Sequence, residues 1–413
     1  MVQDYIQSLF AERVGGSSFG NDATLFKFEK IKRAKREAVQ KNPEIALIDL
    51  GVGEPDWMAE PEVVEELYNQ AGKRENRGYT DNGLQDFKAA AAQYMETVFR
   101  VSGLDAVTEI NHGIGSKSIL ALLPLAFINP GDITLMTVPG YPVIGTMTKA
   151  LGGQVVGLPL LAENGFLPDF TQLTADQRRR AKLLYINYPN NPTGATASKA
   201  FYEQVVQFAR ENQIIVVSDA AYAALTFDGK QPLSFLSVAG AKEVGVEIHS
   251  LSKAFNMTGW RLAFICGNQQ VVKGFAAVKD DHDSGQFAAI QRAGIYCLNH
   301  PEITEKTALK YSRRHDLLTA ALRRVGFTVN KPKASFYLYA AIPKRTRDGR
   351  QFATAEAFAD FLIREKLIST VPWDEAGAYI RLSVTFDAKD ETAEITTIAE
   401  IERRLSEIGF VFE

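Results

Sequence analysis

The sequence predicts an α/β protein with a large, mainly parallel sheet domain followed by a smaller α+β domain. From about residue 45 to residue 285, short apolar runs alternate with helical runs. This alternation favours a parallel sheet that is covered by helices on both faces. Beyond it the order of elements changes, which indicates a second domain. A chain of 413 residues also exceeds what one ordinary core requires.

Each predicted element follows from its local pattern. Apolar runs bounded by turn residues predict the strands of the large sheet at Glu109–His112, Ile133–Val138, Gln154–Leu158, Leu183–Asn187, Ile214–Ser218, Glu247–Leu251 and Arg261–Cys266. Helical periodicity predicts helices at Ser118–Phe127, Lys199–Glu211 and Glu302–Arg324. The smaller domain is expected to contain strands Phe336–Ala341 and Tyr379–Val384 and helices Ala355–Glu365 and Glu394–Ile408.

The expected domain boundaries lie near residues 50 and 290. Residues 51–290 are predicted to form the large domain and residues 291–413 the small domain. Residues 1–50 are expected to join the small domain or to contact a second copy of the chain. They include a basic, amphipathic helix pattern at 25–41.

Composition excludes several classes of partner. A net charge of −3 provides no electrostatic reason to expect nucleic acid or an anionic membrane as a partner. The two cysteines, Cys266 and Cys297, form no metal-binding pattern and are expected to be buried, reduced thiols of a cytoplasmic protein. The first residues lack the pattern of a signal peptide, and no apolar stretch approaches the roughly 20 residues that span a bilayer.

The segment from Ser250 to Arg261, SLSKAFNMTGWR, contains a candidate cofactor lysine, Lys253. By default, a lysine at the end of a strand is a solvated surface residue. Here the hydroxyls of Ser250 and Ser252 and the guanidinium of Arg261 suit a phosphate. Pyridoxal phosphate chemistry requires a lysine beside such a site, because the amine attacks the cofactor aldehyde and later carries a proton.

From about Leu50 to its C-terminus the sequence resembles the class I and II aminotransferases, which are pyridoxal 5′-phosphate (PLP) enzymes of fold type I. Several motifs carry the resemblance in the expected order: Gly113-Ile-Gly-Ser-Lys117, Pro139-Gly-Tyr-Pro142, Asn191-Pro-Thr-Gly194, Asp219-Ala-Ala-Tyr222 and Tyr379-Ile-Arg-Leu-Ser383. The resemblance implies the PLP-dependent transferase fold. It also implies an exchange of amino groups between an amino acid and a 2-oxo acid.

The resemblance assigns roles around the cofactor ring. Asp219 would face the pyridine nitrogen and keep it protonated, which makes the ring an electron sink. Tyr222 and Asn191 would bond the phenolic oxygen of the ring, and Tyr141 would stack on its face. Taken alone, the Asp would be a turn or capping residue, and the other motifs would be ordinary turns.

Further residues are assigned to the phosphate and the substrate. Gly115, Ser116 and Lys117 would form a phosphate cup at a helix start, where free N–H groups favour an anion. Tyr79 would reach the phosphate of a partner subunit, which implies a homodimer with shared active sites. Arg381 would clamp the α-carboxylate of the substrate, although such an arginine could instead form a surface ion pair. Gly53 would line the same carboxylate site, together with Asn191.

Within that family the sequence most resembles LL-diaminopimelate aminotransferases, through the stretches Gly115–Lys117, Leu158–Pro168 and His249–Arg261. The resemblance implies diaminopimelate as the donor and 2-oxoglutarate as the acceptor, with Lys117 near the distal carboxylate. Three positions depart from the pattern. Asn82 replaces a glutamate, Phe26 stands where a tyrosine is expected, and the segment Asp283–Gln291 differs. Asp283 or Gln286 of a partner subunit could recognise the distal end instead.

Other activities remain open at this point. An aspartate, alanine or aromatic aminotransferase would carry the same cofactor motifs, and so would a PLP-dependent lyase or decarboxylase. A regulator built on this fold would carry a DNA-binding extension. The N-terminal segment is short for one and lacks a helix-turn-helix pattern.

Overall fold

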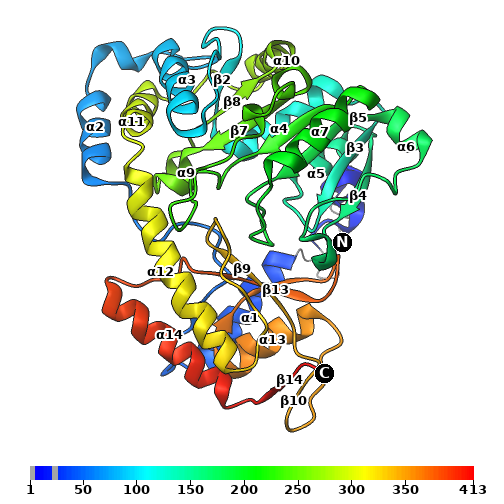
Figure 1. Cartoon of the computed structure of the whole chain (residues 1–413), viewed down its shortest axis with the longest axis vertical. Coiled ribbons are helices and arrows are strands. Elements are labelled where there is room, and N and C mark those ends of the chain that lie inside the picture. The colour runs from blue at the N-terminus through cyan, green and yellow to red at the C-terminus, as the bar shows by residue number, and fades with distance from the viewer. Residues whose placement is uncertain (1–4, 21–26) are drawn as a thin grey trace.

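Two groups of elements, each built around its own sheet, make up the structure (Figure 1). The computed structural model describes residues 5–20 and 27–413. A seven-stranded sheet and its helices form the upper part of the view, and a three-stranded sheet lies in the lower part. Helix α12, Ile303–Arg324, runs from the first group to the second and contacts helices of both.

The large sheet has the strand order β2-β8-β7-β6-β5-β3-β4. Only β8 is antiparallel to its neighbours, so all other strands point in the same direction. The strands are β2 Ile110–Gly113, β3 Ile133–Val138, β4 Gln154–Pro159, β5 Ala181–Asn187, β6 Ile215–Asp219, β7 Gly245–Ser250 and β8 Ala263–Gly267. Each strand predicted for this sheet is therefore present, with its ends shifted by a few residues.

Alternation along the strands produces two buried layers. Leu184 and Val216 belong to one apolar cluster, whereas their neighbours Tyr185 and Val217 belong to the other. Successive side chains of a strand point to opposite faces, so a sheet with both faces covered is apolar at every position. The second cluster packs against α4 Gly115–Phe127, α5 Val143–Ala150 and α10 Gln269–Asp280. The first packs against α3 Gln85–Phe99, α7 Lys199–Asn212 and α11 Ala288–Asn299.

The smaller group contains the antiparallel sheet β12-β13-β9. Its elements are β9 Tyr337–Ala341, β12 Val371–Trp373, β13 Tyr379–Ser383, α13 Ala355–Lys366 and α14 Glu391–Ser406. Helix α1, Lys27–Lys41, packs on α13, and β1, Ile48–Asp49, pairs with β11, Ile368–Ser369. The segment that contains α1 and β1 thus contacts the C-terminal part of the chain. The helix predicted at 25–41 is present from Lys27, and residues 25 and 26 lie outside the described residues.

Shorter elements complete the chain. They are α2 Pro61–Ala71, α6 Ala175–Arg180, α8 Ala241–Val244, α9 Leu251–Ala254, β10 Arg345–Thr346 and β14 Phe410–Val411, with 3-10 helices at Tyr5–Leu9, Glu12–Val14, Gly16–Ser18, Arg74–Arg77, Ala162–Asn164, Phe235–Ser237 and Thr258–Trp260. Cys266 and Cys297 are buried free thiols, as expected, and burial raises the pKa of both. In the described ranges, no helix combines the length and apolarity that crossing a membrane demands.

Candidate active site

The predicted site residues meet at one edge of the large sheet. Asp219 ends β6, Lys253 lies on α9 directly after β7, and Asn191 follows β5. These strands are neighbours, and the carboxyl ends of parallel strands open at the same edge, where α/β proteins bind their ligands. Because β8 runs the other way, Arg261 reaches this edge just before that strand begins.

Lys253 is a buried amine. Its Nζ donates a hydrogen bond to the carbonyl oxygen of Gly53 at 3.0 Å. The pKa of Lys253 is lowered to about 8, mainly by burial. The positive charges of Arg261 and Arg381 contribute to this lowering, and the negative charges of Glu54 and Asp219 oppose it. A larger share of this amine is therefore neutral near pH 7 than for an exposed lysine, which suits a nucleophile or a base.

Asp219 is 5% exposed, and both of its carboxylate oxygens accept hydrogen bonds. Its Oδ2 accepts a hydrogen bond from the Tyr185 hydroxyl at 3.0 Å, and its Oδ1 accepts one from the Ala221 N–H at 3.2 Å. Asn187 Nδ2 donates to the Asp219 carbonyl at 2.8 Å. Burial raises the pKa of Asp219 to about 6. A buried carboxylate of this kind favours a protonated ring nitrogen as its partner.

Several N–H donors converge at the start of α4. Gly115, with φ +75°, begins this helix, and a Cβ atom there would overlap Nη2 of Arg261. Arg261 Nη1 donates to the Thr258 carbonyl at 2.8 Å and approaches Ser252 Oγ at 3.5 Å. Ser250 caps α9 by accepting from the Ser252 N–H. A helix N-terminus, a guanidinium and two hydroxyls together fit a phosphate group.

Arg381 is a buried cation with neutral partners. It is 3% exposed, and it donates from Nη1 to Asn191 Oδ1 at 2.8 Å and from Nη2 to the Gly51 carbonyl at 2.9 Å. Its guanidinium lies over the Tyr337 ring, and its Nε has no hydrogen-bond partner among the described residues. A buried charge is costly without a counter-charge, so this site fits a carboxylate ligand.

Tyrosine rings complete the wall of the site. The Tyr222 and Tyr337 hydroxyls are 3.2 Å apart, and burial raises the pKa of Tyr222 well above its usual range. Tyr141 follows β3, and its pKa is raised by burial and by the negative charge of Asp219. A Cβ atom on Gly53 would lie 2.8 Å from the Tyr337 hydroxyl, so the backbone of Gly53 closely lines the same space.

Other predicted residues form no hydrogen bond to Lys253, Asp219 or Arg381 among the described residues. Lys117 is exposed and Ser116 is half-buried, both in the first turn of α4. Tyr79 is 87% exposed. Asn82 donates to Asp280 Oδ1 and accepts from the Asn111 amide.

The amide of Gln286 is also used within its own chain. Its Oε1 lies 3.0 Å from His112 Nε2, and its Nε2 donates to the carbonyls of Trp260 and Arg261. Asp283 pairs with the buried Lys279. Phe26 lies outside the described residues.

Three further residues of the candidate site were not predicted from the sequence: Tyr185, Asn187 and Tyr337. Period-two alternation puts Tyr185 and Asn187 on the same face of β5. The alternation alone does not show which residue these side chains bond to. That becomes clear only from the register of β5 with β6, in which Asn187 lies opposite Asp219. Tyr337 begins β9, which pairs with the strand of Arg381, so it joins the site only through the smaller sheet.

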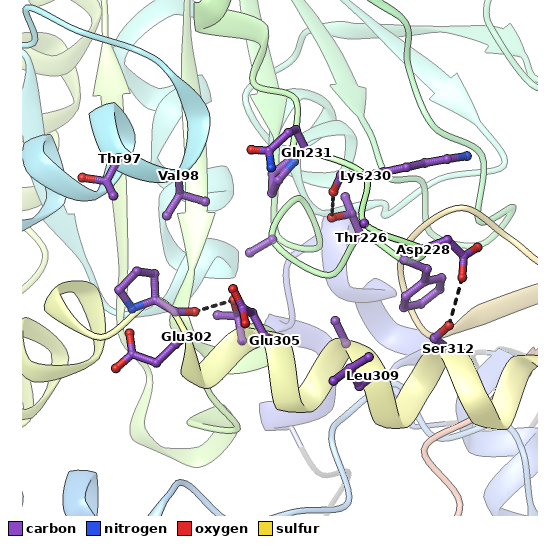
Figure 2. Close-up of a pocket in the computed structure, with 17 residues that line it drawn as sticks. Thr97, Val98, Thr226, Asp228, Lys230, Gln231, Glu302, Glu305, Leu309 and Ser312 are labelled. Atoms are coloured by element: carbon purple, nitrogen blue, oxygen red, sulfur yellow. Dashed lines mark hydrogen bonds between the residues drawn. The ribbon is translucent and has the colours of Figure 1, made fainter.

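A separate cavity of about 580 Å³ lies between α12 and the loop 224–232 (Figure 2). The end of α3 closes it at Thr97 and Val98, and Asp228 bonds to Ser312 across one side. None of the described residues that line it belongs to the predicted cofactor set.

Comparisons with known proteins identify the family of this chain. The family described as aminotransferase class I and II matches residues 45–401. The chain is 58% identical over 420 residues to LL-diaminopimelate aminotransferase of Methanocaldococcus jannaschii and 57% identical over 417 residues to that of Methanococcus maripaludis, with 100% of each chain covered.

Solved structures share the fold. The substrate-bound BacF structure from Bacillus subtilis has a TM-score of 0.86 at 30% identity, and the match covers 98% of this chain and 99% of that one. A Thermus thermophilus aspartate aminotransferase mutant has a TM-score of 0.82 at 25% identity, with 96% and 99% covered. This chain therefore belongs to the class I and II aminotransferases and is a PLP-dependent enzyme of fold type I.

Proposed function

We propose that this aminotransferase transfers an amino group from LL-diaminopimelate to 2-oxoglutarate, or in the reverse direction, in lysine biosynthesis in the cytoplasm. The observation that carries the substrate is the identity of 58% and 57%, over complete chains, to two proteins named LL-diaminopimelate aminotransferase. Relatives from Syntrophobacter fumaroxidans and Moorella thermoacetica with the same name, at 42% and 39% identity, support the same substrate.

We assign the central catalytic role to Lys253. PLP, when bound, supplies an electrophilic carbon and an electron sink for the charge that develops at the substrate Cα. Lys253 Nζ would hold the cofactor and move the proton from the substrate Cα. Its pKa of about 8 supports both tasks, because a useful fraction of the amine is unprotonated near neutral pH.

The other residues of the site would hold the cofactor and the substrate. Asp219, Tyr222, Asn191 and Tyr141 would surround the ring, while Gly115, Ser116, Lys117, Ser250, Ser252 and Arg261 would hold the phosphate. Arg381 and Gly53 would orient the α-carboxylate, which fixes the Cα–H bond toward Lys253. Lys117 is exposed at the start of α4, which leaves its ammonium free to reach a distal carboxylate.

We also infer that the enzyme is a homodimer with shared active sites. Three large side chains near α2 support this inference by their exposure: Tyr79 at 87%, Tyr68 at 81% and Met58 at 80%. Side chains exposed to this degree are accessible to a second copy of the chain. The phosphate of one subunit would then receive Tyr79 from the other. We also propose that residues 51–290 form the large domain and residues 291–413 the small domain, and that residues 1–50 belong to the small domain or to the dimer contact.

A panel of amino donors tests the substrate. The holoenzyme is assayed with 2-oxoglutarate and, in turn, LL-diaminopimelate, lysine, aspartate, alanine and phenylalanine. We expect the largest kcat/KM with LL-diaminopimelate. Turnover of aspartate or phenylalanine without turnover of diaminopimelate would overturn the substrate and leave the aminotransferase class intact. Donor consumption without formation of glutamate would instead indicate lyase activity.

A further inference from the structure

Tyr185 is a buried polar residue to which the proposed function assigns no task. It is fully buried in the middle of β5, and its ring belongs to the apolar cluster that α4, α5 and α10 cover. Its hydroxyl donates to Asp219 Oδ2 at 3.0 Å. A tyrosine hydroxyl in such surroundings requires a partner, and this one is directed at the carboxylate.

Strand register explains why the two groups meet. Tyr185 lies beside Val217 in the parallel pair β5 and β6, and Asp219 is two residues further along on the same face. Both strands are central in the seven-stranded sheet, so neither backbone shifts easily. The hydroxyl is therefore held at the carboxylate by the sheet itself.

Ionisation of Asp219 is opposed by its burial. The pKa of this carboxyl is raised to about 6 by burial, and the Tyr185 hydroxyl is the largest of the effects that lower it. The pKa of Tyr185 is raised well above its usual range by burial and by the charge of Asp219, so the phenol stays protonated and donates. The titratable groups around Asp219 are Tyr185 on β5, Tyr141 after β3, Tyr222 after β6, His249 on β7 and Lys253 on α9.

We propose that Tyr185 is a positioning residue whose hydroxyl orients the Asp219 carboxylate and keeps it ionised toward the ring nitrogen of the cofactor. Its backbone counterpart is the Ala221 N–H, which binds the other oxygen. The side chain acts through Asp219 and needs no contact with the substrate. Cofactor retention at mildly acidic pH depends on it.

The affinity of the apoenzyme for PLP, measured against pH by absorbance titration, tests this role. In the wild-type protein, affinity falls as pH drops through about 6, because Asp219 becomes protonated. Tyr185→Phe keeps the ring and removes the hydroxyl. We expect the midpoint to rise by roughly one pH unit, and the affinity at pH 6 to fall roughly fivefold. Ionisations of PLP itself affect both proteins alike.

Tyr188→Phe is the matched control. Tyr188 is equally buried, but its hydroxyl donates to the Phe166 carbonyl at 2.7 Å, and its ring packs on the other face of the sheet. The same chemical change there leaves the midpoint where it is in the wild type. An equal shift in both variants would overturn the role of Tyr185.

Asp219→Asn separates this inference from the function on which it rests. If Asp219→Asn weakens PLP binding while Tyr185→Phe matches the wild type, the inference on Tyr185 fails and the role of Asp219 stands. If Asp219→Asn binds PLP as the wild type does, the proposed role of Asp219 fails.

A variant with a stronger hydrogen-bond donor at position 185 completes the test. This variant can also be measured if Tyr185→Phe does not fold. Tyr185→3-fluorotyrosine preserves the shape of the side chain and has a more acidic hydroxyl. We expect the midpoint to move to lower pH. An unchanged midpoint in the folded protein overturns the proposal.

Discussion

At the scale of single residues, the candidate active site contains two ionisable groups that burial moves toward their neutral forms. The pKa of Lys253 is lowered to about 8 and that of Asp219 is raised to about 6, with desolvation as the largest cause in both cases. The negative charge of Asp219 partly offsets the effect of desolvation on the pKa of Lys253, and the positive charge of Lys253 does the same for Asp219. The site can therefore exchange protons close to neutral pH, where exposed lysines and aspartates do not titrate.

The first prediction concerns the pH dependence of cofactor capture. Only the neutral amine of Lys253 attacks an aldehyde. At pH 7 roughly a tenth of an amine with a pKa of about 8 is neutral, against far less for an ordinary lysine. We expect the rate at which the apoenzyme captures PLP covalently to rise with pH and to level off above about pH 8. Stopped-flow absorbance measures this rate.

Lys253→Ala provides the control for this measurement. This variant lacks the amine, so the phase with a midpoint near pH 8 should be absent. A midpoint near pH 10 in the wild-type protein would contradict the role of burial. The same phase in the variant would show that another lysine reacts.

At the scale of elements, the proposed phosphate site depends on how a strand ends and a helix begins. β2 ends at Gly113, and α4 starts at Gly115 with φ +75°, a backbone conformation that favours glycine. Arg261 also has a positive φ, +59°, at the turn that leads into β8. Gln286 holds the carbonyl of Arg261, so a segment far along the chain stabilises this turn.

The second prediction concerns Gly115→Ala. A Cβ atom at this position would overlap the Arg261 guanidinium, so the side chain must move away from the start of α4. We expect PLP affinity to fall at least tenfold and the free energy of unfolding to fall by about 1 kcal/mol. Fluorescence titration with PLP and denaturant unfolding provide the two measurements.

Gly103→Ala separates backbone strain from the steric effect. Gly103 has a nearly equal φ of +73°, and no atom lies within 4 Å of a Cβ placed there. This control should show a similar loss of stability with unchanged PLP affinity. If Gly115→Ala also retains PLP affinity, the Arg261 guanidinium does not need its observed position.

At the scale of the whole molecule, a buried ion-pair network links the two groups of elements. Arg314 on α12 bonds to Glu394 of α14 at 2.8 Å and pairs with Asp56 at 3.0 Å. Asp56 also pairs with Lys310 at 2.8 Å, and all four side chains are at most 6% exposed. Asp56 follows the Gly53 segment that accepts the Lys253 hydrogen bond. The network thus fixes this segment against α12.

The third prediction is that Arg314→Met strongly destabilises the fold. Removing the guanidinium leaves Asp56 and Glu394 with less compensation in a buried site, and three backbone carbonyls lose a donor. We expect the free energy of unfolding to fall by roughly 3–5 kcal/mol. Arg324→Met, on the same helix, removes an exposed pair with Glu402 and should have little effect on denaturant unfolding. If both variants lost the same free energy of unfolding, burial of the ion-pair network would not contribute to stability.

The sequence alone determined the fold class and most of the strands, and it supplied the candidate cofactor residues. Those features depend on local signals: apolar alternation identifies strands, and short motifs such as Asp219-Ala-Ala-Tyr222 carry their chemistry within a few residues. Lys253, Asp219, Arg261 and Arg381 could be named for this reason.

Tertiary structure alone decided which side chains support that chemistry. Strand register brings the Tyr185 hydroxyl to Asp219, and the smaller sheet brings Tyr337 to Tyr222. Gln286, from a distant segment, holds the Arg261 carbonyl. Other hydrogen bonds, to Asp280 and to the Trp260 carbonyl, hold the Asn82 and Gln286 amides within their own chain. Burial sets the pKa values of Lys253 and Asp219, and it depends on neighbours from the whole chain. Residue types are local properties of the sequence, whereas desolvation and hydrogen-bond partners arise only when distant segments pack together.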